Sequence, residues 1–114
     1  MVDEDPVVTN PEHYAPLWEN ERVRVLEYVD TPGSETTPHV RPDTVLVALT
    51  SFQRRLFVND DHVDVEIAAG RAVWLPAQRH AGRNIGDSET RTILIELKGE
   101  SGAAESGGLG PDLG

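Results

Sequence analysis

"HVDVEIAAG", residues 62–70, is the stretch that decides the fold class, because polar and apolar side chains alternate along it without a break. Val63, Val65 and Ile67 fall on one face of an extended chain, and the polar residues between them fall on the opposite face. A period of two residues is typical of a β-strand with one buried face. Gly70 comes last, and a glycine at this point indicates a turn. The stretch therefore predicts a β-strand that ends at a turn.

The segments on either side of this strand also show β-strand patterns. Asp60 and Asp61 precede it, where the tip of a hairpin belongs. No segment shows a long run with the period of an α-helix. Several short strands separated by turn signals predict a single all-β domain, either a sandwich or a barrel. The predicted strands are RVRVLEYVD (22–30), DTVLVALTS (43–51), FQRRLFVN (52–59), HVDVEIAAG (62–70), RAVWLPA (71–77) and RTILIELKG (91–99).

The two ends of the chain contain little that a core could bury. We expect residues 1–7 to form a flexible arm, residues 8–98 to form the barrel domain, and the glycine-rich residues 99–114 to form a disordered tail. NPEHYAPLWENE (10–21) contains two prolines and two aromatic residues. We expect it to form a turn or a short helical piece that covers one mouth of the barrel with Trp18.

The charge and composition exclude several classes of function. Six of the 20 acidic residues lie before residue 6 or after residue 99, so residues 6–99 hold 14 acidic and 10 basic residues and carry only −4 of the formal −10. No basic patch is visible, so a nucleic-acid partner is not expected. The chain has no cysteine, which excludes disulfides, thiolate metal sites and cysteine nucleophiles. No signal peptide and no apolar run long enough to span a membrane are present, so we expect a cytoplasmic protein without a membrane partner.

Two motifs that contain histidine carry a family resemblance. Five residues separate Gly33 from His39, and GRAVWLPAQRHAGRN (70–84) places His80 four residues before Asn84. These pieces, in this order, resemble the cupin superfamily over residues 8–98, and in particular its small single-domain "cytoplasmic protein" members. The resemblance implies a small jelly-roll-like β-barrel. It also implies a homodimer that pairs through an edge strand or a sheet face, and exposed sheet edges need covering in any case.

The motifs depart from the family pattern at the positions that bind metal. In typical cupins two histidines and a glutamate of the first motif and one histidine of the second hold a metal ion. Here Arg41 replaces the second histidine, an apolar residue stands at the glutamate position, and Gln78 stands where glycine is usual. Of the ligands that the resemblance implies, only His39 and His80 remain.

Strand alternation predicts which side chains share the cavity. If His39 points into the barrel, then so does Arg41, and so do the alternate residues Asp43, Val45, Val47 and Leu49. His80 would join them from a neighbouring strand, with Gln78 two residues away. Glu96 places a carboxylate inside an apolar strand, and Trp74 would form core or pocket wall. The pattern predicts a polar pocket mouth above an apolar floor.

The leading hypothesis for function is the binding and transformation of a small anionic or enolisable organic molecule without a cofactor. Arg41 is a fixed cation with a planar donor fork that suits a carboxylate or phosphate. His39 and His80 would be the general acid and base of an isomerase-, lyase- or cyclase-like reaction. The predicted catalytic residues are thus His39, His80 and Arg41, and the predicted substrate-binding residues are Gln78, Asp43, Glu96 and Trp74.

Three alternatives stay open at this point. The first is a cupin enzyme that depends on Fe, Mn, Ni or Zn, held by His39 and His80 with a third ligand from Gln78, Asp43 or Glu96. That reading requires a carboxylate to neutralise Arg41, which otherwise repels a dication. The second is a domain that binds a small molecule as a sensor or carrier and catalyses nothing. The third is structural: Arg41 pairs with Asp43 or Glu96 and fills the barrel, and His39 is a core histidine that donates to a backbone carbonyl.

Overall fold

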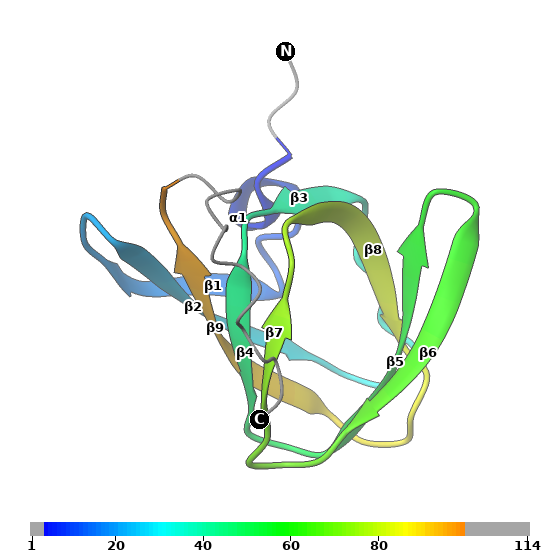
Figure 1. Cartoon of the computed structure of the whole chain (residues 1–114). Helices are drawn as coiled ribbons and strands as arrows, with labels where there is room; N and C mark the ends of the chain where they lie inside the picture. The colour runs from blue at the N-terminus through cyan, green and yellow to red at the C-terminus, as the bar shows by residue number, and fades with distance from the viewer. Residues whose placement is uncertain (1–3, 100–114) are drawn as a thin grey trace.

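The computed structural model describes residues 4–99, and these form two antiparallel β-sheets that face each other (Figure 1). The all-β prediction is confirmed. In chain order the elements are α1 (Pro6–Thr9), β1 (Tyr14–Glu19), β2 (Val23–Asp30), β3 (His39–Arg41), β4 (Thr44–Ala48), β5 (Phe52–Val58), β6 (Asp61–Ile67), β7 (Ala72–Leu75), β8 (Gln78–Asn84) and β9 (Thr90–Leu97).

The strands divide into a five-stranded and a four-stranded sheet. The first has the order β1-β2-β9-β4-β7 and the second the order β3-β8-β5-β6. β2 and β9 pair along their whole length, from Val23 opposite Leu97 to Asp30 opposite Thr90. Their inward residues Leu26 and Leu94 pack with Tyr14 and Tyr28 in a buried apolar cluster. The core therefore lies between the sheets, on the inner face of the five-stranded one.

The hairpin between β5 and β6 forms as predicted, but its tip begins one residue earlier. Asn59 adopts a left-handed backbone conformation with φ of 59°, which asparagine tolerates better than most residues. Asp61 already belongs to β6 and pairs with Val58. Gly70 has φ of 90° and makes the turn before β7, as the sequence predicts.

The prediction for residues 10–21 was right about a turn, which lies at residues 11–13, but wrong about the role of Trp18. Half of this segment forms β1, an edge strand paired with β2, and Trp18 is 57% exposed and covers no mouth of the barrel. Pro16 is tolerated because an edge strand leaves backbone N–H groups without a partner strand. The short helical piece is α1, which begins at Pro6 with the Asp5 side chain accepting from the Val7 backbone N–H. Asp-Pro is a helix-start signal, here within the segment expected to be a flexible arm.

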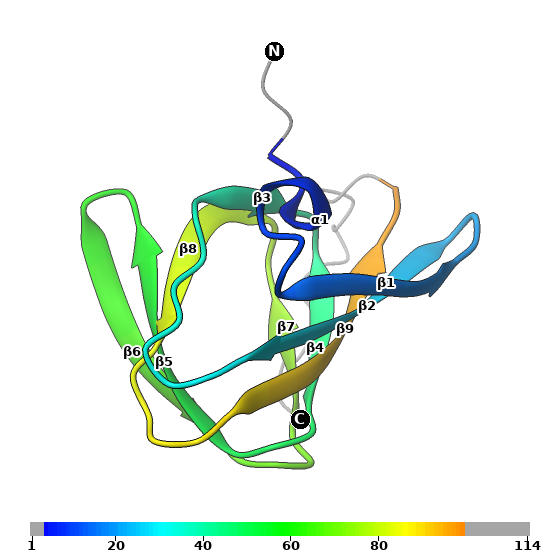
Figure 2. The same cartoon turned by 180° about the vertical axis from the view of Figure 1, so that it is seen from behind.

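Residues 4–10 are held against one end of the barrel, where α1 lies beside β3 (Figure 2). Glu4 forms an ion pair with Arg79, and Asp5 forms one with Arg24. The domain limits predicted from the sequence stay predictions, and the predicted tail falls outside the described residues beyond Gly99. Within the described part of the chain, no helix is long and apolar enough to cross a membrane.

The predicted alternation from His39 to Leu49 breaks at Pro42 and Asp43. β3 pairs with β8 in one sheet, whereas β4 pairs with β7 and β9 in the other. The chain passes from one sheet to the other at this point. As a result, the even-numbered residues of β4 point inward, whereas in β3 the odd-numbered residues do. Thr44 and Leu46 line the cavity, in place of the predicted valines and Leu49, which is exposed.

Candidate functional site

A cavity of about 80 Å³ lies between the two sheets. One water molecule needs roughly 10–15 Å³ by this measure, so the cavity has room for several waters or a small molecule. Its wall is mainly apolar and includes Leu46, Phe52, Leu56, Val65, Ile67 and Leu94. Its polar lining includes His39, Arg41, Arg54, His80 and Glu96. An apolar pocket with a few convergent polar groups is the usual form of a small-molecule site.

Arg41 enters the cavity from β3 and is held by neutral acceptors. The register of β3 with β8 places Arg41 opposite Gln78 and His39 opposite His80. Arg41 Nε donates to the Pro76 carbonyl at 3.2 Å, and Nη2 donates to Gln78 Oε1 at 3.2 Å. Nη1 lies 2.9 Å from Nε2 and 3.0 Å from Nδ1 of His80, whose unprotonated nitrogen accepts the bond.

No carboxylate forms an ion pair with Arg41 within residues 4–99. Glu96 lines the cavity but accepts from Arg24 at 2.8 Å, and burial raises the pKa of this carboxyl. Asp43 accepts from the Ala77 backbone N–H at 2.9 Å. Arg41 is only 7% exposed, and burial lowers the pKa of its guanidinium to about 10, so it stays charged at neutral pH. The described residues therefore leave one buried cation uncompensated at the cavity.

His39 has both ring nitrogens in use. It is 2% exposed, and its Nδ1–H donates to the Thr37 carbonyl at 2.8 Å. Nε2 is then the acceptor, and the Tyr14 hydroxyl donates to it at 3.2 Å. Burial lowers the pKa of His39, so the ring stays neutral. This arrangement is that of a structural histidine that orients Tyr14 and the start of β3.

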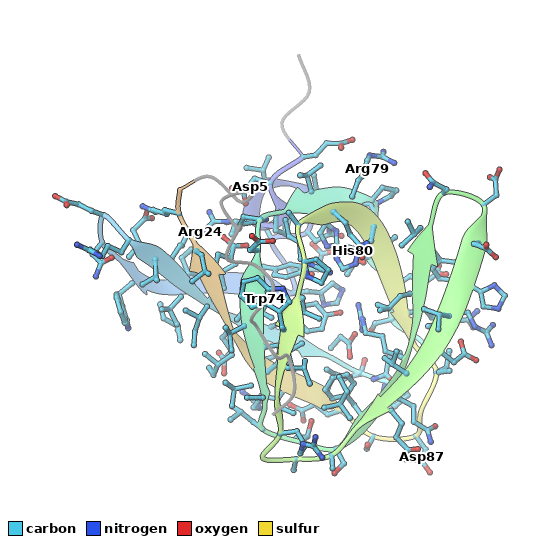
Figure 3. The ribbon with its side chains drawn as sticks, in the orientation of Figure 1. Asp5, Arg24, Trp74, Arg79, His80 and Asp87 are labelled. Carbon is cyan, nitrogen blue, oxygen red and sulfur yellow. The ribbon has the colours of Figure 1, made fainter. Side chains whose placement is uncertain are left out.

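His80 belongs to β8 (Figure 3), and its ring contacts Arg41 and the ring of His39. The two imidazole rings meet edge to face, with centroids 4.8 Å apart. Burial, with the Arg41 guanidinium next in importance, lowers the pKa of His80 to about 2. The ring is therefore neutral at physiological pH and has no proton to donate as an imidazolium in the ligand-free site.

The donor set does not fit a divalent metal ion. Residues 4–99 contain no group of three His, Asp, Glu or Cys side chains arranged to hold one, whereas a mononuclear site usually takes three protein ligands. Nε2 of His39 already accepts from Tyr14, and the guanidinium of Arg41 lies 2.9 Å from a ring nitrogen of His80. A dication placed between the rings would be repelled by that cation.

The structure brings only some of the predicted site residues to the cavity. His39, Arg41, His80 and Glu96 line it, and Gln78 reaches it through its bond to Arg41. Trp74 does not line it, because this residue pairs with Val45 on the outer face of the five-stranded sheet and is 37% exposed. Asp43 stabilises the chain at Ala77, outside the cavity lining.

Sequence reasoning missed a second guanidinium, that of Arg54. Its Nη1 donates to Asp30 at 2.9 Å, and its Nη2 donates to the Tyr28 hydroxyl at 2.9 Å. Asn84 donates to the other carboxylate oxygen of Asp30. The sequence did contain a signal for Arg54. Strand alternation from Phe52 puts Arg54 on the same face as Phe52, which is the apolar face of β5.

Comparisons with proteins of known structure bear on the fold. A cupin domain from Bordetella pertussis Tohama I is 27% identical, covers 87% of this chain and 99% of its own, and superposes with a TM-score of 0.68. An RmlC-like cupin family protein with a double-stranded β-helix fold, from Methanocaldococcus jannaschii, is 16% identical over 74% of this chain and 77% of its own, with a TM-score of 0.61. A cupin superfamily protein from Desulfitobacterium hafniense DCB-2 is 17% identical over 75% and 76%, with a TM-score of 0.57.

These likenesses confirm the two-sheet jelly-roll fold that the motifs predicted. None of the three descriptions states an activity. No family model matches the sequence, and no curated protein gives a significant match. Any function must therefore be argued from the cavity itself.

Proposed function

We propose that this chain, a small protein of the cupin superfamily, binds a small organic carboxylate inside its barrel, with Arg41 as the residue that holds the anion. The observation that carries the proposal is a buried guanidinium at the cavity without an ion-pair partner among the described residues. A buried charge is costly unless it is paired, and a ligand carboxylate would supply the pair.

The other charges at the cavity are already balanced. Arg54 pairs with Asp30, and Glu96 pairs with Arg24. A guanidinium has five N–H donors, and Arg41 uses three of them on Pro76, His80 and Gln78. Among residues 4–99 nothing takes the other two N–H donors, which are therefore left for a ligand. Charge-assisted bonds to a carboxylate are among the stronger hydrogen bonds in proteins. The apolar wall fits the hydrocarbon part of such a ligand.

Any proton transfer in this site is assigned to His80 alone. His39 is committed to Thr37 and Tyr14, whereas the contacts of His80 are with Arg41 and the His39 ring. A carboxylate bound to Arg41 would offset the positive charge that faces His80 and raise the pKa of its ring toward the ordinary value. In this proposal His80 becomes a base only in the complex. The same site would serve a protein that only binds its ligand. In that case the ligand has no proton that His80 can remove, and no reaction follows.

Thermal unfolding with butyrate and with butyramide tests the proposal. Butyrate is expected to raise the melting temperature, because a ligand that binds only the folded state stabilises it. Butyramide, which has no charge, is expected to leave it unchanged. Arg41→Gln should fold, since it leaves no carboxylate without a partner. It should weaken butyrate binding about tenfold or more. The control is Arg83→Gln, which removes an exposed arginine of the same strand pair. Equal shifts for butyrate and butyramide would contradict the proposal.

We also propose that this protein forms a homodimer, in which a second copy of the chain binds to the outer face of the five-stranded sheet. One row of cross-strand neighbours crosses this whole face and is entirely apolar; it consists of Trp18, Val25, Ile95, Val45 and Trp74. The charged residues beside it on this face, Arg91 and Glu27, pair with each other within the chain. Two copies could therefore meet here without unpaired like charges, in spite of the acidic composition.

Trp74→Gln is expected to shift this assembly to monomer, because it puts a polar amide in the apolar row. Analytical ultracentrifugation at micromolar concentration measures the change. Leu49→Gln is the control, since Leu49 is exposed but lies beyond the end of β4. A wild-type protein that sediments as a monomer at every concentration would rule out the second copy.

A further inference from the structure

The inner face of β8 positions two guanidinium groups in one cavity. Gln78 and His80 contact Arg41. Two residues further on, Gly82 lies directly under the side chain of Arg54: a Cβ atom at Gly82 would come within 2.6 Å of Arg54 Nε and 2.7 Å of Nη2. The absence of a side chain at Gly82 is what lets Arg54 lie across the strand.

Arg54 has donors left over after its internal bonds. It gives one N–H to Asp30 and one to Tyr28, so three of its five remain within the described part of the chain. The Arg54 side chain projects from the inner face of β5, lines the cavity and is 11% exposed. Arg54 can therefore donate to a ligand without giving up its present partners.

The charge around Arg54 determines what kind of group it would accept. The Asp30 carboxylate has no exposed surface and is 2.9 Å from Arg54 Nη1, so the pair is neutral as a whole. A second carboxylate of the ligand would face that of Asp30 and be repelled by it. A neutral oxygen acceptor, such as a carbonyl or hydroxyl, meets no such repulsion.

We propose that Arg54 is a second recognition group for the same ligand, and that the ligand is a carboxylic acid with an additional oxo or hydroxy oxygen. This inference rests on the proposed function, because it assumes that Arg41 holds the carboxylate. His80 and Gly82, which mark the two guanidinium positions, are two residues apart, roughly 7 Å along a strand. A chain of a few carbon atoms between the carboxylate and the second oxygen spans this separation.

Calorimetric titration with levulinate and isocaproate tests the inference. The two acids are similar in length and size, but the ketone oxygen of levulinate is replaced by a methyl group in isocaproate. Wild-type protein is expected to prefer levulinate about fivefold, which is the scale of one hydrogen bond. Isocaproate measures carboxylate binding alone, so its failure to bind would overturn the proposed function, and equal affinities for the two acids would overturn only the role of Arg54.

Two variants separate Arg54 from the rest of the cavity. Gly82→Ala is expected to displace the guanidinium and abolish the preference for levulinate, while the affinity for isocaproate stays within about twofold. Gly86→Ala is the matched control, because its added Cβ would come no closer than 3.4 Å to the side chain of Gln53. Should Gly82→Ala not fold, Arg54→Lys keeps the charge opposite Asp30 and removes the donor fork. A preference for levulinate that persists in the folded variant would overturn the assignment to Arg54.

Discussion

Replacing Asp30 by alanine is expected to lower the free energy of unfolding by about 3–5 kcal/mol, because it leaves the charge of Arg54 buried without its partner. The Asp30 side chain is completely buried and accepts hydrogen bonds from Tyr28, Arg54 and Asn84. Arg54 cannot turn to solvent, since its side chain lies across Gly82 inside the barrel. Urea denaturation at neutral pH measures the loss.

The adjacent ion pair of the same strand provides the control. Arg55 follows Arg54 on β5 but points outward, where it binds Asp64 at 2.7 Å on the surface. Exposed pairs of this kind contribute about 0.2–1 kcal/mol, so Asp64→Ala should have a much smaller effect. Equal losses of unfolding free energy for Asp30→Ala and Asp64→Ala would contradict the burial of the Arg54–Asp30 pair.

Acidification is expected to destabilise the protein through His80. The pKa of His80 is about 2 in the folded chain and has its ordinary value of about 6.5 in the unfolded chain. Between these values the unfolded chain binds a proton that the folded chain does not. The free energy of unfolding therefore falls as the pH falls below about 6.5, by about 1.4 kcal/mol per pH unit for this group. From pH 7 to pH 5 the loss through His80 is about 2 kcal/mol.

The variant His80→Gln is expected to lose this part of the pH dependence. Glutamine keeps an acceptor for Arg41 but has no proton to bind, so the variant should be about 2 kcal/mol less sensitive to the change from pH 7 to pH 5. Urea denaturation at the two pH values measures it, and His62→Gln, on the exposed end of β6, is the control. If wild type and His80→Gln lose the same stability, His80 is not held neutral by its surroundings.

The strands could be predicted from the sequence because alternation is a local property. Residues 62–70 alternate, and β6 forms there with the predicted turn at Gly70. The same logic failed between His39 and Leu49, because Pro42 and Asp43 carry the chain from one sheet to the other and shift the inward phase. A change of sheet depends on which strands pair, and no pattern within the segment records that pairing.

The site could be predicted in part. The resemblance and the alternation brought His39, Arg41 and His80 together correctly, and the register of β3 with β8 is the reason. What the sequence could not supply is which carboxylate pairs with which guanidinium. Glu96 pairs with Arg24 across two neighbouring strands, and Arg41 has no acidic partner among residues 4–99. Ion pairing between distant segments is decided by the three-dimensional packing.

The role of His39 shows the same limit. Its residue type and motif position suggested acid–base chemistry, which titration near neutral pH would support. In the structure its nitrogens bind the Thr37 carbonyl and the Tyr14 hydroxyl, and burial lowers its pKa. The bond from His39 to the Thr37 carbonyl could be expected from the sequence, because the two residues are two positions apart. The bond from Tyr14 could not, because Tyr14 lies on an edge strand of the other sheet.

The most direct test of the account is the NMR signal of the Arg41 side chain during a titration with butyrate. The Nε–H resonance of Arg41 is identified as the one missing from the spectrum of Arg41→Gln. The account predicts that butyrate shifts this resonance to saturation, whereas butyramide at the same concentrations leaves it in place. An Arg41 resonance that butyrate does not move, in a protein whose other signals are those of the folded state, would contradict the claim that Arg41 holds the anion.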